Sequence, residues 1–168
     1  MSSKSVSTSE SLLDELQATL AHGTVARRVE TLRRVTDLFI NGAVDYSNDQ
    51  IELFDDVFQC LMHHIETSAK ALLANRLAPV DRAPPLTIRA LAFDDLIEVA
   101  APVLSRSEQL GDDVLIETAR NKSQAHLMAI STRRVLSNAV TDVLVQRDRK
   151  STRLNSSHCV TSRMPSSA

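Results

Sequence analysis

Apolar residues recur along this chain at steps of three, four and seven positions, and no run of β-branched residues alternates strictly with polar ones. Steps of three and four place side chains on one face of an α-helix, whereas a half-buried strand needs strict alternation. The longest such series consists of Ile51, Phe54, Phe58, Leu61, Ile65 and Leu72. The pattern therefore predicts an all-α protein.

Capping residues and prolines divide this pattern into separate helices. Ser47 and Gln50 have the spacing of a capping box, in which each side chain bonds the backbone N–H of the other residue, so a helix is predicted to begin there. Three prolines between residues 78 and 85 remove that stretch from helical geometry, which predicts an internal linker. The predicted helices span residues 9–21, 24–41, 48–77, 86–104 with a kink or a new start at Pro102, 112–119, 123–130 and 137–147.

These helices are mostly short and are joined by short turns, and each carries an apolar stripe that it cannot cover alone. Antiparallel helical hairpins that stack on one another cover such stripes mutually. The sequence therefore predicts an α-solenoid or an irregular helical bundle, although no exact repeat period is visible. We expect a single helical domain over residues 9–148, with the linker at about 78–85, after a disordered N-terminus at residues 1–8.

The composition excludes several classes of function. Three glycines far apart leave no glycine-rich phosphate loop, so nucleotide binding of that kind is excluded. The longest stretch without charged residues, residues 16–26, is too short to span a membrane, and residues 1–6 do not begin a signal peptide. Cys60 and Cys159 are too few for a disulfide framework. We expect a soluble cytoplasmic protein that needs no cofactor.

The charge of the predicted domain argues against nucleic acid as a partner. The whole chain carries a net charge of −2, but residues 149–168 contain four basic residues and no acidic one, which leaves −6 on residues 1–148. A groove that collects phosphates needs a positive field. Binding to nucleic acid or to an anionic membrane is therefore disfavoured.

Four arginines on two turns of the second predicted helix are the candidate partner-binding residues: Arg27, Arg28, Arg33 and Arg34. Arginine is enriched at protein interfaces, and the same four side chains give the alternative of a nucleic-acid-binding helical repeat. Glu30 lies three and four residues before Arg33 and Arg34, which is the spacing of ion pairs on a solvated helix face. That simpler interpretation is the stronger one.

Cys60 and His64 lie one helical turn apart, beside His63 and Glu66, and form the densest group of metal-capable side chains. A structural zinc site needs four ligands, and no second pair of cysteines or histidines completes one. Adjacent carboxylates such as Asp55 and Asp56 point about 100° apart on a helix and do not form an acid–base pair. We predict no catalytic, metal-binding or cofactor-binding residue and no enzyme; a metal-dependent enzyme using Cys60 and His64 is the least favoured alternative.

Several segments of the chain carry a family resemblance. They read AFDD at residues 92–95, IEVAAPVLS at 97–105, KSQAHL at 122–127 and LSNAVTDVLV at 136–145, and ARRVETLRRVTDLF at 26–39 is similar as well. These segments resemble the largely alphaproteobacterial family called domain of unknown function 2336, over most of residues 10–148. The resemblance implies HEAT-like helical hairpins and no agreed activity. We therefore expect an uncharacterised protein–protein interaction or scaffold module without catalysis.

Residues 149–168 resemble the translated read-through of a sequencing adaptor. They contain six serines, four basic residues and no acid, so a non-native, disordered tail is predicted. Proteins of the family named above normally continue past Asp148 into further helical repeats. We therefore expect an incompletely covered apolar side at Val140, Val143 and Leu144, and self-association of the chain through that truncated end.

Overall fold

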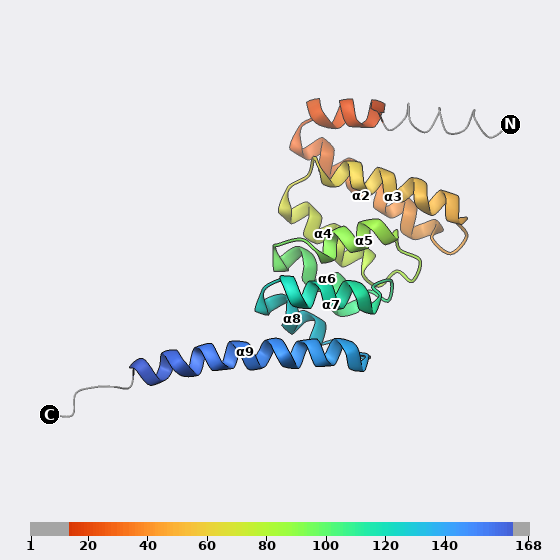
Figure 1. Ribbon diagram of the computed structural model, residues 1–168. Coiled ribbons are helices and arrows are strands. Elements are labelled where there is room, and N and C mark those ends of the chain that lie inside the picture. The colour runs from red at the N-terminus through yellow and green to blue at the C-terminus, as the bar shows by residue number, and fades with distance from the viewer. Residues whose placement is uncertain (1–13, 163–168) are drawn as a thin grey trace.

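The structure is a computed structural model that describes the backbone of residues 14–162 and the side chains of residues 14–151 (Figure 1). Within that range it contains helices and turns and no strand, which confirms the all-α class. The helices are residues 14–22, α2 (Val25–Gly42), α3 (Asn48–Met62), α4 (Thr67–Leu77), α5 (Pro85–Ala92), α6 (Ile97–Arg106), α7 (Asp112–Asn121), α8 (Gln124–Ser131) and α9 (Asn138–Ser162). The predicted disorder of residues 1–8 falls outside the described residues.

Local capping fixes the start of the helices that the sequence predicts best. The hydroxyl of Thr24 accepts the N–H of Arg27 at 3.3 Å and caps α2. The capping box of α3 is complete, because the Ser47 hydroxyl accepts the N–H of Gln50 at 3.3 Å and the Gln50 side chain accepts the N–H of Ser47 at 2.9 Å. Pro85 opens α5, where its missing N–H removes no helical hydrogen bond.

Two long helices predicted from the sequence are each two helices in the structure. The predicted helix over 48–77 is broken at residues 63–66, where Glu66 is extended with ψ of 165°. The predicted helix over 86–104 is broken at residues 93–96, where Asp94 accepts the N–H of Leu96 at 3.0 Å in a local turn. The spacing of apolar residues does not reveal either break, because the same three- and four-residue steps continue on both sides of the short turn. Pro102, where a kink or a new helix start was predicted, lies inside α6, which continues through it.

The helices stack in two rows (Figure 1). In the first row α2 packs on α4, α4 on α6 and α6 on α8; the second row holds α3 with α5 and α7 with α9. Consecutive helices thus alternate between the rows, and each row shelters the apolar stripes of the other. The arrangement is compatible with an α-solenoid and with an irregular bundle.

Hydrogen bonds between the helices reveal a spacing that the sequence does not display. Most bonds between distant segments join residues 25 to 39 positions apart. Examples are Leu86 with Asp55, Arg106 with Asn75, Arg133 with Leu104, and Arg147 with Arg120. A separation of about one helical pair is what stacked hairpins produce, because each pair contacts its neighbours.

The apolar core runs through the stack without interruption. At the N-terminal end the ring of Phe39 packs edge-on against Phe54 and Phe58, with centroids 5.1 and 5.9 Å apart. Further along the chain the core consists of aliphatic side chains: Leu73, Leu77, Ile88, Leu91, Val99, Val103, Leu104, Ile130 and Val140. Four of the five aromatic residues therefore lie at one end, and aliphatic packing holds the rest.

The end formed by α9 differs from the sequence prediction. Val140 and Val143, expected to be incompletely covered, are buried with 0% and 7% exposure, and Leu144 is half-buried. α9 contacts α7 and α8, and these contacts cover the apolar side of α9. The prediction of an uncovered apolar side was therefore wrong, and self-association stays a prediction.

The segment after Asp148 also differs from the sequence prediction in its backbone. Disorder was predicted from residue 149, whereas α9 continues as a helix to Ser162. Extending an existing helix is easier than starting one, because each added residue closes a hydrogen bond on an already formed turn. The non-native origin of residues 149–168 stays a prediction.

Thr118 on α7 offers a test of packing. Its side chain is fully buried, and its hydroxyl has no hydrogen-bond partner among the described residues. A buried hydroxyl without a partner is destabilising, so Thr118→Val should raise the free energy of unfolding by about 1 kcal/mol. Urea unfolding measures this. Thr87→Val is the matched control and should have the opposite sign, because the buried Thr87 hydroxyl bonds Asp55; a loss of stability in Thr118→Val would contradict the prediction.

Candidate functional site

The four arginines predicted to bind a partner lie on α2, and two of them are engaged by carboxylates. Nε of Arg33 lies 3.1 Å from Glu30 Oε2, and Nε of Arg34 lies 2.8 Å from Glu30 Oε1. Arg27 and Arg28 line a shallow cleft between residues 14–22 and α2, together with Glu30 and Arg34. The ion pairs expected from the spacing are present, and binding of a partner by these arginines stays a prediction.

Glu30 predicts a pH dependence of stability. Hydrogen bonds from Arg33 and then Arg34 lower the pKa of Glu30 from 4.5 to about 2. Because the pKa is lower in the folded state, the stabilisation is present above pH 4.5 and is lost as the pH falls from 4.5 to about 2. Thermal unfolding of the wild type and Glu30→Gln should therefore differ at neutral pH and converge in that window. High salt should reduce the difference, because the Glu30 side chain is 43% exposed; a difference independent of pH would contradict this.

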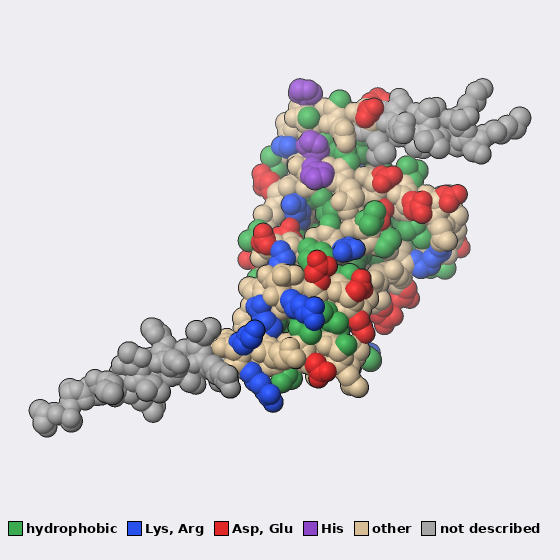
Figure 2. All heavy atoms as spheres, in the orientation of Figure 1, with side chains coloured by type: hydrophobic (Ala, Val, Ile, Leu, Met, Phe, Trp, Pro, Cys, Tyr) green, Lys and Arg blue, Asp and Glu red, His purple; other side chains and the backbone are tan. Residues whose placement is uncertain are grey.

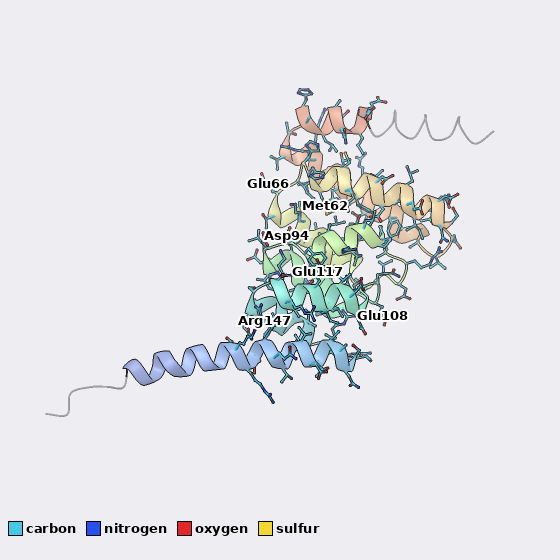
Figure 3. All side chains as sticks on the ribbon, in the orientation of Figure 1. Met62, Glu66, Asp94, Glu108, Glu117 and Arg147 are labelled. Carbon is cyan, nitrogen blue, oxygen red and sulfur yellow. The ribbon has the colours of Figure 1, made fainter. Side chains whose placement is uncertain are left out.

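Cys60 lies in α3, and His64 lies in the turn that follows this helix. Cys60 is buried in the core, and burial raises the pKa of its thiol, which weakens it as a ligand and as a nucleophile. His64 is half-buried and His63 is exposed, at the turn between α3 and α4 where Figure 3 labels Met62 and Glu66. The described part of the chain holds no group of three or more His, Cys, Asp or Glu side chains placed for a metal ion.

Asp55, which the sequence marks only as the neighbour of a second carboxylate, Asp56, has a structural role. It is 2% exposed, and its carboxylate accepts the N–H of Leu86 at 2.8 Å and the N–H of Thr87 at 2.7 Å, as well as the Thr87 hydroxyl. These are free donors of the first turn of α5, and its N-cap residue Pro84 makes no side-chain cap bond. Asp55 on α3 thus caps α5 from a distance. No local signal reveals this, because the partners are 31 and 32 residues away.

His126 is the buried histidine of the described chain and links α8 to the turn before α6. Its Nδ1 lies 2.7 Å from the hydroxyl of Ser123, and its Nε2 lies 2.9 Å from the carbonyl oxygen of Asp94. A carbonyl only accepts, so Nε2 carries the hydrogen. A contact between serine and histidine is also found in nucleophilic catalysis. Here the histidine is oriented by a backbone carbonyl, and the hydroxyl belongs to Ser123, the N-cap residue of α8, which makes no side-chain cap bond to the backbone.

Three arginines bind carbonyl oxygens at the C-terminal end of an earlier helix. Arg82 reaches the carbonyls of Ala43 and Val44 after α2. Arg133 donates to Leu104 and Ser107 at the end of α6, at 2.7 and 2.8 Å. Arg147 donates to Arg120 and Lys122 at the end of α7. Cations are favourable there, because the last carbonyls of a helix are unpaired and carry partial negative charge.

A second set of links runs along the C-terminal ends of the first row. Arg76 at the end of α4 pairs with Asp37 on α2 at 2.5 Å. Arg106 at the end of α6 donates to the side-chain oxygen of Asn75 on α4 at 2.9 Å. Arg133, after α8, reaches α6 through the carbonyls described above. We call these three residues the arginine edge.

A cleft lies at one end of the arginine edge. It has a volume of about 780 Å³ and is lined by Ser105, Arg106, Glu108, Thr132, Arg133, Arg134 and Val135. Burial lowers the pKa of Arg133, while Glu108 and Asp112 act in the opposite direction. Figure 3 shows Glu108 and Arg147 near opposite ends of α7. No sequence motif singles out these arginines; the available signal is their position, at the last residue of α6 and just after α8.

Figure 2 shows basic side chains gathered toward α7 and α9 on the displayed face. Arg120, Arg147 and Lys150 line a second cleft there, of about 580 Å³. The negative charge of the chain as a whole thus coexists with a basic end of the stack. No described helix combines the length and the apolar character that crossing a membrane requires.

Comparison with known proteins bears on residues 99–155. The sequence model of a family described as "Uncharacterised protein conserved in bacteria (DUF2336)" matches that segment, which includes most of α6, all of α7 and α8, and the first part of α9. Among curated proteins and among solved structures, the comparisons found no match. The resemblances noted at residues 26–39 and 92–95 lie outside the match. Over residues 99–155, this chain is therefore similar to the DUF2336 family of bacterial proteins.

Proposed function

We propose that this chain is a non-catalytic helical-repeat module that binds a protein partner in the cytoplasm. The observation that carries the proposal is the continuous first row, in which α2, α4, α6 and α8 contact one another in order. In the second row, α5 and α7 make few contacts and the series is less continuous. A continuous row offers one extended surface, which is how stacked helical repeats hold partners.

Exposed apolar side chains on the first row support this choice. Leu38 on α2 is 60% exposed, Leu72 on α4 is 49% exposed and Met128 on α8 is 68% exposed. Large apolar side chains at intervals along one row supply the contacts that dominate the centre of protein interfaces. Leu53 on α3 and Leu86 on α5 are exposed on the second row and serve as a comparison.

The engagement of the buried polar side chains supports a role without catalysis. Asp55 and His126 bond backbone groups of neighbouring segments, and Arg133 closes the end of α6. Groups that are committed to holding helices together are poorly placed to exchange protons with a substrate. The proposed cytoplasmic location rests on the sequence features alone.

Affinity purification from cells that naturally carry a DUF2336 protein tests the proposal. The tagged wild-type chain should recover a reproducible protein partner, identified by mass spectrometry. A variant with Leu38→Ser, Leu72→Ser and Met128→Ser should recover much less of it. The matched control, Leu53→Ser with Leu86→Ser, should recover as much as the wild type. Failure to recover any reproducible partner, or equal loss in both variants, would count against the proposal.

A further inference from the structure

The groups that accept hydrogen bonds from the arginine edge differ in charge between its two ends. At the α4 position, the charge of Arg76 is matched by the carboxylate of Asp37 at 2.5 Å. At the next two positions the acceptors are neutral: the amide oxygen of Asn75 for Arg106, and backbone carbonyls for Arg133. In the arginine edge, the charge of Arg76 is therefore neutralised by a carboxylate, whereas Arg106 and Arg133 keep their positive charge.

The unmatched charges converge on the cleft at the ends of α6 and α8. Among the described residues, no carboxylate oxygen lies within 4.0 Å of the guanidinium nitrogens of Arg106, Arg133 or Arg134. Glu108 also lines the cleft, so the lining residues carry a formal charge of +2. Arg133 is half-buried, with Glu108 and Asp112 acting on its charge, whereas Arg106 and Arg134 are exposed. A bound anion offsets the remaining positive charge of the lining.

Two of the three guanidinium groups are held in place before any ligand arrives. Arg133 is fixed by its bonds to Leu104 and Ser107 at 2.7 and 2.8 Å, and Arg106 by its bond to Asn75 at 2.9 Å. A guanidinium carries five N–H donors, so both residues keep donors free for a ligand. Arg134 is exposed and has no hydrogen bond to another described side chain. Preorganised donors bind with a smaller loss of conformational freedom.

We propose that this cleft binds a phosphate group. A phosphate monoester carries a charge of about −1.5 to −2 at neutral pH and three strong acceptor oxygens, which match a lining of charge +2 better than a single carboxylate does. Arginine pairs with phosphate through parallel hydrogen bonds. The volume of about 780 Å³ leaves room for the molecule that carries the phosphate.

Titration of the purified full chain with inorganic phosphate, followed by backbone amide NMR at constant ionic strength, tests the site. Phosphate should shift the amides of residues 105–108 and 132–135. Arg134→Gln and, separately, Arg106→Gln should each weaken binding about tenfold or more, because each removes a hydrogen bond between charged groups. Arg27→Gln on α2 is the matched control and should bind phosphate like the wild type. Circular dichroism verifies that each variant is folded.

A second arm distinguishes the source of the phosphate. A phosphoserine peptide that binds more tightly than inorganic phosphate would indicate a phosphorylated protein, and equal affinities would indicate a free phosphate compound; both support the site. The proposal is overturned if phosphate moves none of these amides, if Arg27→Gln weakens binding as much as Arg134→Gln, or if phosphorylated and unphosphorylated peptides bind equally. Phosphate binding needs no protein partner, so this result is separable from the test of the proposed function.

Discussion

Replacing Asp55 with alanine is expected to lower the free energy of unfolding by about 3–5 kcal/mol, the largest effect that we predict for one side chain. The carboxylate accepts the N–H of Leu86 and of Thr87, together with the Thr87 hydroxyl. Removing it leaves up to three donors at the start of α5 without a partner, and each such donor contributes a loss of about 1–3 kcal/mol when buried. Chemical denaturation measures the effect.

Two further variants separate capping from packing. Asp56→Ala changes the exposed neighbour and should alter stability by less than about 0.5 kcal/mol. Asp55→Asn keeps the shape but turns one acceptor into a donor, so it should fall between Asp55→Ala and the wild type. Thr87→Val should destabilise the Asp55→Ala background less than the wild type, because the partner of the hydroxyl is already gone. Equal stabilities of Asp55→Ala and Asp56→Ala would show that the cap contributes nothing.

Replacing Arg133 with methionine is expected to lower the free energy of unfolding by about 2–3 kcal/mol. Methionine retains much of the apolar stem, so the change removes mainly the guanidinium and its bonds to Leu104 and Ser107. A hydrogen bond from a charged donor contributes about 1.5–3 kcal/mol, and the loss also leaves carbonyls at the buried end of α6 unpaired. Thermal and chemical unfolding give the value.

Arg134→Met is the matched control, because Arg134 is the exposed neighbour in the sequence. Without phosphate it should change stability by less than about 0.5 kcal/mol. Hydrogen exchange supplies a local readout: in Arg133→Met the amides in the last turn of α6, up to Ser107, should exchange faster, whereas those of α3 should not. Equal protection of α6 in the two variants would contradict a role of Arg133 in closing that helix.

Features that depend on residues close together in the sequence were predicted correctly, and features without such a local signal were missed. The capping box at Ser47 and Gln50 was predicted because its two bonds join residues three positions apart. The break before α4 was missed because Glu66, its N-cap residue, makes no side-chain cap bond and so leaves no local signal. The ion pairs of Glu30 with Arg33 and Arg34 were anticipated for the same reason as the capping box, since both partners lie within one helical turn.

The candidate binding residues, too, were recognised only where they lie close together in the sequence. The arginines chosen from the sequence were those adjacent to one another on α2, where Glu30 and Asp37 neutralise two of them. The arginines that line the cleft at the ends of α6 and α8 come from separate segments, around residues 106 and 133, and only the packing of α6 on α8 brings them together. Their significance depends on contacts 26 to 31 residues apart, which no short motif records.

The sequence by itself determined the helical class, the starts of α2, α3 and α5, and the absence of a glycine-rich phosphate loop, because turns, caps and apolar faces depend on neighbours within about one helical turn. Only the tertiary structure decided the order of helices within the two rows, the burial of Val140 and Val143, and the partners of Asp55, His126 and Arg133. The physical reason is that a buried polar or apolar group takes its partner from whatever segment the stacking brings beside it, about one helical pair away along the chain.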